Sequence, residues 1–424
     1  MKRNFRILLV FFMLILSYNC NSKKEKTANS KTKITASDIL GNPNYLAISY
    51  GGYREKSRDV QPTIQELKDD LKILSAMNIK VLRTYNVHLA QASNLLEAIH
   101  QLKKEDTNFE MYVMLGAWID CENSFSSENG DPNHEKENPR NAKEIETAVS
   151  LAKKYPNIVK IIAVGNEAMV KWATSYYVKP KVILKWVHHL QNLKKKGELP
   201  TDLWITSSDD FASWGGGDES YKVKELEELI KAVDYVSMHT YPYHNSHYNP
   251  SFWKVSKDEE NLSDIEKVDK VMLRALEFAK NQYKNVFKYV KSIDSTKQIH
   301  IGETGWATIS NGHYGANGSR ATDEYKQAKY YQLIRDFTNK NKISCFYFEA
   351  FDEQWKDANN TEGSENHFGL INLKNEAKYP LWKMVDNGVF NGLKRNGKPI
   401  TKTYNGNLDS LIKSVQTPNT EYPR

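Results

Sequence analysis

Two glutamates stand where short apolar runs of the chain end. The run 161–164 leads through a glycine and Asn166 into Glu167, and the run 299–301 leads through a second glycine into Glu303. Apolar runs of this length suit buried strands, and a buried carboxylate costs free energy unless it is paired. One such glutamate would usually be a solvated side chain in a turn, but the repeated arrangement indicates a shared task. Hydrolysis of a glycosidic bond needs two carboxyl groups, one as acid/base and one as nucleophile.

The elements that would hold these glutamates alternate between strand and helix along the chain. Eight short apolar runs, each followed by a turn signal, predict strands, and helical patterns lie between them. This alternation predicts an α/β fold, a single-domain (β/α)8 TIM barrel with parallel strands. The predicted strands are 46–50, 81–84, 112–117, 161–165, 203–206, 235–239, 298–303 and 345–349, and the predicted helices are 64–74, 144–154, 181–196, 223–232, 265–289 and 324–339.

Aromatic and polar residues gather at the ends of the predicted strands, where a barrel of this kind carries its chemistry. A sugar offers an apolar face of C–H groups and a rim of hydroxyls, so aromatic rings stack on the face while carboxylates and amides bind the rim. A single aromatic residue at such a place is more often core packing, but the recurrence at one register favours a sugar-binding cleft. The candidate contacts are Tyr50, Arg83, Tyr85, Trp118, Asn166, His239, Tyr241, Trp306, Glu353, Trp355 and Lys356.

Six short motifs, in order and at barrel spacing, carry a family resemblance. Together they resemble glycoside hydrolase family 17, the β-1,3-glucanases and β-1,3-glucanosyltransferases of the glutamate-pair barrel clan, over roughly residues 45–390. The motifs are Tyr112-Val-Met-Leu-Gly-Ala-Trp118, Val164-Gly-Asn-Glu167, Met238-His-Thr-Tyr-Pro-Tyr243, Ile301-Gly-Glu-Thr-Gly-Trp306, Phe348-Glu-Ala-Phe-Asp-Glu-Gln-Trp-Lys356 and His367-Phe-Gly-Leu370.

The resemblance implies a role for each matching position. Glu167 would be the acid/base and Glu303 the nucleophile. Asn166 would hold the sugar 2-hydroxyl, and Arg83 and Tyr241 would stand near the nucleophile. Two further positions that match sugar contacts of the family are Glu353 and Lys356.

The charge of the chain is concentrated before residue 37. The formal net charge is +7, and the first 36 residues, with eight basic side chains and one acidic, carry all of it. The rest of the chain is neutral overall, which removes the main electrostatic support for a nucleic-acid partner. Three basic residues precede the apolar run 7–16, a pattern typical of an export signal and too short for a membrane span.

Cys20 follows this run, at the place of the lipidated cysteine of bacterial lipoproteins. Tyr18 and Asn19 are bulkier than the residues usual before that cysteine, so an ordinary signal peptide is the alternative. We expect an exported protein that is lipid-anchored to the cell envelope, at the outer membrane or cell surface, and that touches the membrane only through the lipid. The predicted organisation is a lipoprotein-type signal peptide (1–20), a flexible Lys/Ser/Asn tether (21–36), the barrel (37–390) and a tail packing on it (391–424).

Cofactor and metal signals are weak. Cys121 and Cys345 fall at opposite ends of predicted parallel strands, which predicts free thiols. His239, His244 and His247 lie close in sequence but lack the fixed ligand spacing of a zinc site. We therefore predict no metal and no cofactor, and a monomer with a polysaccharide or oligosaccharide as its partner.

Three functions remain open from the residues. The leading one is an exported retaining hydrolase that cleaves β-1,3-glucan of the laminarin type through a two-glutamate double displacement. A glucanosyltransferase would share the intermediate and would need aromatic rings on the acceptor side, for which Trp172, Trp306 and Trp355 are candidates. A catalytically silent glucan-binding lipoprotein would need the aromatic residues but not the two acids. The long segment 259–297 and the loop 311–319 leave chain-length preference and branch tolerance open.

Overall fold

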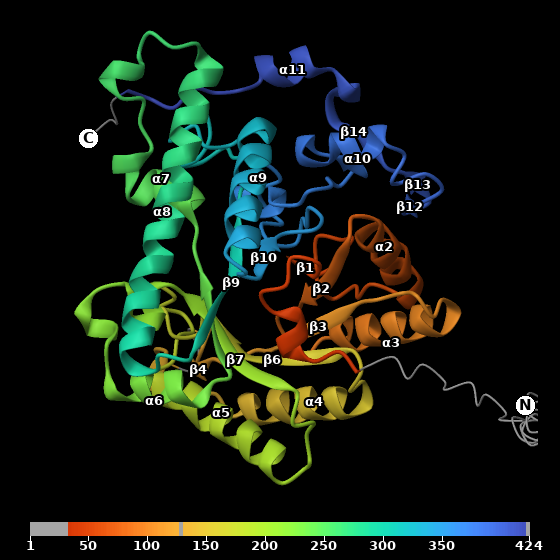
Figure 1. Ribbon diagram of the computed structural model, residues 1–424, viewed down its shortest axis with the longest axis vertical. Helices are drawn as coiled ribbons and strands as arrows, with labels where there is room; N and C mark the ends of the chain where they lie inside the picture. Colours follow the sequence, from red (N-terminus) through yellow and green to blue (C-terminus); the bar gives the residue numbers. More distant parts are fainter. Residues whose placement is uncertain (1–32, 127–129, 421–424) are drawn as a thin grey trace, which may run out of the picture. The chain divides into compact units, whose positions relative to one another are not determined.

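A closed barrel of parallel strands forms the centre of the structure (Figure 1). The computed structural model describes residues 33–126 and 130–420. In this part of the chain, each barrel strand pairs with the barrel strands before and after it, and the last pairs with the first. The predicted (β/α)8 fold is therefore confirmed. The barrel strands are β1 (Leu46–Ser49), β2 (Ile79–Arg83), β3 (Tyr112–Ala117), β6 (Val159–Asn166), β7 (Trp204–Asp210), β8 (Tyr235–His239), β9 (Gln298–Gly305) and β10 (Cys345–Phe348).

Helices cover the outside of the barrel (Figure 1). One long helix follows each strand up to β9, whereas β10 is followed by short turns and α10 (Trp382–Asp386). The helix after β2 was not predicted, and its N-cap residue Leu89 provides no capping side chain. The long helices are α2 (Ile64–Ala76), α3 (Ala90–Glu105), α4 (Arg140–Lys154), α5 (Pro180–Lys195), α6 (Lys224–Ala232), α8 (Asp264–Ile293) and α9 (Glu324–Lys340).

The two faces of the barrel strands pack in two separate cores. Outward side chains such as Ile48, Val113 and Ile162 join the large core beneath the helices. Inward side chains at the amino ends form a smaller cluster, which includes the short helix α1 (Ala36–Ile39). This apolar cluster fills the amino end, so the polar groups of the interior are left to the carboxyl end. Its strand members are Ala47, Val81, Tyr112, Met114, Ile161, Ala163, Tyr235 and Phe346.

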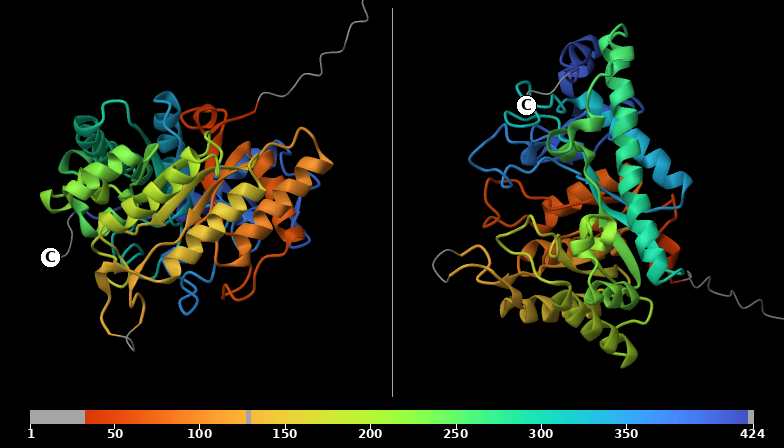
Figure 2. Two further views of the ribbon diagram at one scale, coloured as in Figure 1. Left: turned by 90° about the horizontal axis from the view of Figure 1, so that it is seen from below. Right: turned by 90° about the vertical axis from the view of Figure 1, so that its left-hand side faces the viewer.

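Two insertions follow strand ends at the carboxyl face. A hairpin of β4 (Cys121–Glu122) and β5 (Asn133–Glu137) follows β3, and it forms the orange loop at the lower edge of the left view of Figure 2. The helix α7 (Pro242–Tyr248) follows β8. Both insertions therefore start from strands that border the two glutamates.

The segment after residue 390 lies against the barrel helices. Arg395 Nε donates to Oδ1 of the buried Asp70 on α2 at 3.0 Å. Buried Lys326 Nζ on α9 donates to the carbonyl of Gln416 at 2.6 Å. The short elements near the C-terminus are β11 (Glu376–Ala377), β12 (Lys394–Arg395), β13 (Lys398–Pro399), β14 (Thr401–Lys402) and α11 (Leu408–Lys413).

Other predictions concern cysteines and the membrane. Cys121 and Cys345 are buried free thiols, as predicted, and burial raises the pKa of Cys345 to about 11. Among residues 33–126 and 130–420, no helix has the length and apolar character needed to cross a membrane. Cys20, the predicted signal peptide and most of the predicted tether lie outside the described residues.

Candidate active site

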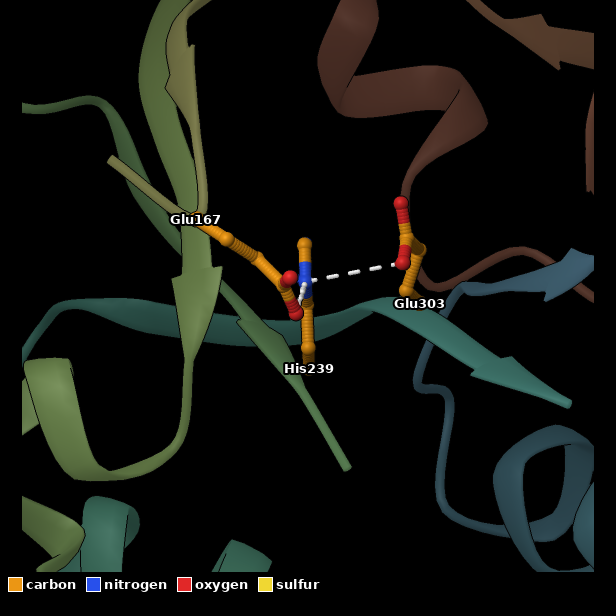
Figure 3. Close-up of side chains that lie close together, drawn as sticks. All are labelled: Glu167, His239 and Glu303. Atoms are coloured by element: carbon orange, nitrogen blue, oxygen red, sulfur yellow. Dashed lines mark hydrogen bonds and ion pairs between the residues drawn. The ribbon is translucent and has the colours of Figure 1, made fainter. Parts of the chain in front are cut away.

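Glu303 can lie at the centre of the carboxyl face because a glycine precedes it on β9. A Cβ atom at Gly302 would lie 2.2 Å from Oγ of Ser237 and 2.4 Å from Oγ of Ser208. Only glycine therefore lets β9 approach the side chains of the two preceding strands so closely. Glu303 itself is 5% exposed, and its carboxylate points towards Glu167 and His239 (Figure 3).

Positive charge and a hydroxyl keep Glu303 ionised. Arg83, at the end of β2, forms an ion pair with Oε1 of Glu303, and the hydroxyl of Tyr241 donates to Oε2 at 2.8 Å. Burial alone disfavours the carboxylate. The charge of Arg83, then His239 and the Tyr241 hydrogen bond, outweigh burial and lower the pKa of Glu303 to about 2. Glu303 is thus ionised at neutral pH, which is the state a nucleophile needs.

Glu167 follows β6 on a backbone in the left-handed region. Gly165 has φ +81, and a Cβ there would lie 2.8 Å from Cβ of Ala168. Glu167 has φ +46, which is uncommon for a side chain of its size. Such conformations persist where the surrounding structure requires them, and they cluster at functional sites. The side chain of Glu167 is 17% exposed, so a substrate can reach it.

The surroundings of Glu167 raise its pKa, whereas those of Glu303 lower it. Burial, and then the negative charge of Glu303, raise the pKa of Glu167 to about 8. One carboxyl oxygen of each glutamate lies within 4.8 Å of the other. Two carboxyl groups this close, with pKa values on opposite sides of neutrality, have the protonation states that an acid and a nucleophile require.

His239 lies between the two glutamates (Figure 3). Its Nδ1 is 3.0 Å from Oε1 of Glu167 and 3.7 Å from Oε2 of Glu303, while Nε2 is 2.8 Å from Oγ of Ser208. Burial lowers the pKa of His239 to about 4, so the ring is neutral at neutral pH. The ring has no exposed surface. The predicted sugar contact at His239 is therefore wrong, and the ring positions Glu167 instead.

The same three side chains each place one possible metal-ligand atom within 4.8 Å of the others. Arg83 already provides the positive charge at Glu303, and Tyr241 binds the second oxygen of that carboxylate. A cation bound there would stand beside the guanidinium and compete with both donors. These contacts favour an acid and a nucleophile at this position over a metal centre.

Asn166, at the end of β6, belongs to the same hydrogen-bond network. Arg83 Nη2 donates to Oδ1 of Asn166, and Nη1 also donates to the carbonyl of Gly302 at 2.9 Å. The bond from Arg83 occupies the amide oxygen of Asn166, so the NH2 group of the amide is left to donate to a sugar hydroxyl. Tyr85 supports the arginine, because the guanidinium lies over its ring at 4.8 Å from the centroid.

Lys356 and Glu353, which match sugar contacts of the family, follow β10. Lys356 Nζ pairs with buried Glu349 and lies 3.6 Å from Oε2 of Glu353. The lysine side chain is 11% exposed. Burial raises the pKa of Glu349 well above its ordinary value, and the nearby Lys356 opposes that shift.

Glu353 joins two loops rather than facing the cleft. Its Oε1 accepts the backbone N–H of Tyr53 at 3.0 Å, and its Oε2 accepts Nε1 of Trp355 at 2.9 Å. Glu353 is 2% exposed, so the direct sugar contact predicted for it is replaced by a positioning role. The Arg58 guanidinium lies over the ring of Trp355, 4.3 Å from its centroid, which covers one face of that ring.

Two other predicted sugar contacts are core residues. Tyr50 is 1% exposed, and its hydroxyl donates to Oδ2 of Asp70 at 2.9 Å. Trp306 has no exposed surface, and its Nε1 donates to the carbonyl of Ala321 at 2.8 Å. Both predictions were wrong because a position at a strand end does not say which face of the sheet the side chain takes.

Asp209 and Asp210, at the end of β7, were not identified from the sequence. Asp209 Oδ2 accepts the backbone N–H of Met169 at 2.7 Å, which holds the loop after Glu167. Burial and then the charge of Glu167 raise the pKa of Asp210 well above its ordinary value, and its Oδ1 accepts the backbone N–H of Ala212 at 2.8 Å. The sequence 207–210 is polar, and the predicted strand therefore ended at residue 206.

Trp118, a predicted sugar contact, lies partly exposed directly after β3. Its Nε1 donates to Oδ2 of Asp120 at 3.2 Å. Two rings that the sequence analysis did not single out, Phe125 and Tyr176, pack beside it. Aromatic residues in these two loops carry no periodic signal, so only the fold reveals the group.

Comparison with known proteins agrees with this geometry. The model of the BtgE/BtgC glycoside hydrolase domain matches residues 47–369. The chain belongs to the BtgE/BtgC glycoside hydrolase family. It is therefore a glycoside hydrolase, and the resemblance to family 17 relatives predicted from the motifs is confirmed.

Three relatives of this BtgE/BtgC-type hydrolase differ in their sequence identity to it. An endo-laminarinase from Formosa Hel1_33_131 is 62% identical, with a TM-score of 0.90 over 92% of this chain and 99% of that one. A probable glucan endo-1,3-beta-glucosidase of Aspergillus terreus is 24% identical over 81% of this chain, which spans about half (47%) of that relative. A family 17 β-1,3-glucanosyltransferase from Rhizomucor miehei is 19% identical, with a TM-score of 0.53 over 80% of this chain and 96% of that one, and shows the fold alone.

Proposed function

We propose that this hydrolase is a retaining endo-β-1,3-glucanase that cleaves laminarin-type glucan by double displacement. The observation that carries the proposal is the pair of Glu167 and Glu303, whose carboxyl oxygens approach within 4.8 Å. Retaining glycosidases hold their carboxyl groups about 5–5.5 Å apart, whereas inverting ones need about 6.5–9.5 Å to admit a water molecule. The short separation and the opposite pKa shifts both support the retaining mechanism.

In the first step, the Glu303 carboxylate attacks the anomeric carbon of the sugar. The bond from that carbon to the glycosidic oxygen breaks, and protonated Glu167 gives its proton to the departing oxygen. A covalent glycosyl ester on Glu303 results. Asn166 is placed to hold the 2-hydroxyl of the reacting sugar, where hydrogen bonds strengthen in the transition state.

In the second step, water attacks the same carbon from the side that the leaving group vacated. Glu167 is now ionised and takes a proton from this water, which restores its starting state. The ester bond to Glu303 breaks and returns the carboxylate to its contacts with Arg83 and Tyr241. Two inversions at one carbon leave the product with the β configuration of the substrate.

The substrate class is supported by the relatives. An endo-laminarinase is 62% identical to this chain over 92% of its length, and the curated Aspergillus terreus relative is named for endo-1,3-β-glucan cleavage. Partly exposed aromatic residues near the two glutamates, such as Trp118, suit the stacking of successive glucose rings. Internal cleavage would release a ladder of oligosaccharides from a long glucan.

The decisive experiment follows the products of linear β-1,3-glucan by size and by anomeric form. We expect mixed oligosaccharides whose first-formed reducing ends are β. Glu303→Ala should lose turnover and keep glucan binding, while Glu167→Ala should spare substrates with a leaving group that needs no proton. Glu225→Ala on the outer helix α6 is the matched control. An α-configured first product, or both active-site variants retaining most activity on polymer, would refute the proposal.

Transfer to a second sugar is the competing outcome, because water and a sugar hydroxyl can both attack the same intermediate. The same experiment at high oligosaccharide concentration separates the two functions. Products longer than the substrate from the earliest time points would make the protein a glucanosyltransferase. A chain that binds glucan with no turnover of any substrate would be a glucan-binding protein.

We also propose that the N-terminal segment exports the protein and attaches it to the cell envelope through a lipid on Cys20. The basic residues, the apolar run and the cysteine support this proposal. A single acyl chain binds membranes only marginally, so stable anchoring requires more than one chain on the cysteine. Cys20→Ser should move the protein to the soluble fraction, and unchanged membrane retention of that variant would contradict the proposal.

A further inference from the structure

Three aromatic rings form a continuous group on the carboxyl face of the barrel. Tyr176 stacks on Phe125 with centroids 5.1 Å apart and an angle of 25° between the rings. Trp118 lies 5.3 Å from Tyr176 and 6.4 Å from Phe125. The three residues come from two different loops, one after β3 and one after β6. We call this group the aromatic platform.

The platform is held in place by backbone bonds between those loops. The N–H of Phe125 donates to the carbonyl of Ser175 at 3.0 Å, and the N–H of Cys121 donates to the carbonyl of Tyr176 at 3.1 Å. Trp118 is fixed separately through Nε1, which donates to Asp120. A rigid set of rings loses little conformational entropy on binding a ligand.

Phe125 has an exposed ring and a strained backbone, neither of which contributes to the stability of the fold. Its side chain is 60% exposed, although burial of an aromatic ring is among the largest sources of stability. Its backbone φ is +55, which is an outlier for a bulky residue. Strained positions of this kind cluster at ligand-binding sites. The exposed ring is therefore available to a ligand.

The platform lies next to the acid/base. Trp118 directly follows β3, whose last residue Ala117 pairs with Val164 of the strand that leads to Glu167. The loop that carries Tyr176 begins directly after Glu167 and returns to it, since the N–H of Val178 donates to the carbonyl of Ala168 at 2.7 Å. Burial and then the charge of Glu167 raise the pKa of Tyr176, which agrees with this proximity.

We propose that the aromatic platform is a glucan-binding subsite on the leaving-group side of the cleft, with Phe125 and Tyr176 stacking on sugar rings beyond the cleaved bond. The inference rests on the proposed function, because Glu167 must face the glycosidic oxygen as the acid. Glu303 attacks the sugar on one side of the cleaved bond, and Glu167 protonates the oxygen that leaves with the sugar on the other side. Aromatic rings next to Glu167 therefore lie beside the leaving portion of the glucan. The ligand is a linear β-1,3-glucan of several glucose units.

The test combines binding and kinetics of Phe125 variants. Binding is measured with laminarihexaose in the Glu303→Gln background, and kinetics with laminarin and with an aryl β-laminaribioside, whose leaving group is not a sugar. Loss of one stacking ring should raise the Kd for hexaose and lower kcat/KM on laminarin by about three- to tenfold in Phe125→Ala. The aryl substrate should be unaffected.

Two matched variants separate ring stacking from general effects. Phe125→Tyr keeps a flat ring and should restore binding, whereas Phe125→Leu keeps apolar bulk without a ring and should not. Phe287→Ala removes another exposed phenylalanine, which lies on the outer helix α8 and is 45% exposed, and should change nothing.

Each remaining outcome has one meaning. Unchanged hexaose binding in Phe125→Ala would overturn the platform as a subsite while the proposed function stands. An equal loss on the aryl substrate would place the platform on the opposite side of the cleaved bond and overturn the assignment. No hexaose binding in the Glu303→Gln background, before any change at Phe125, would contradict the proposed function itself.

Discussion

Replacing Tyr241 by phenylalanine isolates one of the contacts that keep Glu303 ionised. The substitution removes the hydroxyl that donates to Oε2 of Glu303 at 2.8 Å and keeps the ring, which packs edge-on against Phe348 and Phe368. A hydrogen bond to a charged group is worth about 1.5–3 kcal/mol, and one pKa unit corresponds to about 1.4 kcal/mol. The pKa of Glu303, lowered to about 2 in the native site, should therefore rise by about one to two units.

The sign of this shift predicts a change at acidic pH only. The nucleophile must be ionised, so kcat/KM falls as pH drops through the pKa of Glu303. The acid limb should move from near pH 2 to about pH 3–4 in Tyr241→Phe, because a group with a higher pKa is protonated earlier as pH falls. The basic limb reports Glu167, whose pKa is raised to about 8. Within the described residues no hydrogen bond joins Glu167 to Tyr241, so this limb should not move.

The assay is kcat/KM on laminarin across the pH range, with circular dichroism at each pH to confirm that the protein is folded. Tyr243→Phe is the matched control. This buried tyrosine packs its ring against Trp306 and makes no bond to either catalytic glutamate among the described residues. An acid limb that coincides in Tyr241→Phe and wild type, or that moves equally in Tyr243→Phe, would refute the reasoning.

Three further substitutions test the charge and packing of the fold. Glu167→Gln should raise the melting temperature relative to wild type, and the difference should grow between pH 5 and pH 8. In wild type the pKa of Glu167 is about 8 in the folded state, so over this range the unfolded chain has already lost the proton that the folded chain keeps, and the folded state loses stability as pH rises. Arg395→Met should cost about 1.5–3 kcal/mol in urea unfolding, because buried Asp70 loses one charged donor but keeps Arg54 and the Tyr50 hydroxyl, whereas exposed Lys398→Met should cost little. Trp306→Phe should lower the melting temperature by a few degrees with KM unchanged, and a raised KM at normal stability would restore the sugar contact that its burial argues against.

The barrel could be predicted because its signals are local. Each strand is a short apolar run with a turn after it, and both glutamates follow such runs. The helix α3 was missed, although its buried residues Leu95, Leu96, Ile99 and Leu102 follow helical spacing. The fifth strand was cut short because 207–210 are polar. In the fold these polar side chains are used, because Ser208 contacts His239 and Asp209 holds the loop after Glu167.

Roles at the site were harder to predict than positions. Glu167, Glu303, Arg83 and Tyr241 lie together because parallel strands bring their carboxyl ends to one face. Whether a side chain at such an end faces the cleft depends on the local pleat and on its neighbours, and Trp306 is instead buried in the core. The aromatic platform depends on two loops that meet only in the folded chain, so no spacing in the sequence could indicate it.

In the proposed mechanism, the proton on Glu167 must be present in the first step and absent in the second, and the neighbouring groups can accommodate both states. When Glu303 becomes an ester, its negative charge disappears, and with it one of the causes that raise the pKa of Glu167, while burial remains. His239 stays neutral and can reverse its hydrogen bonds, accepting from protonated Glu167 or donating to the ionised form. The hydroxyl of Ser208 at Nε2 can accept or donate to match. A neutral, buried histidine therefore suits this position better than a charged one, which would favour the ionised acid in the first step.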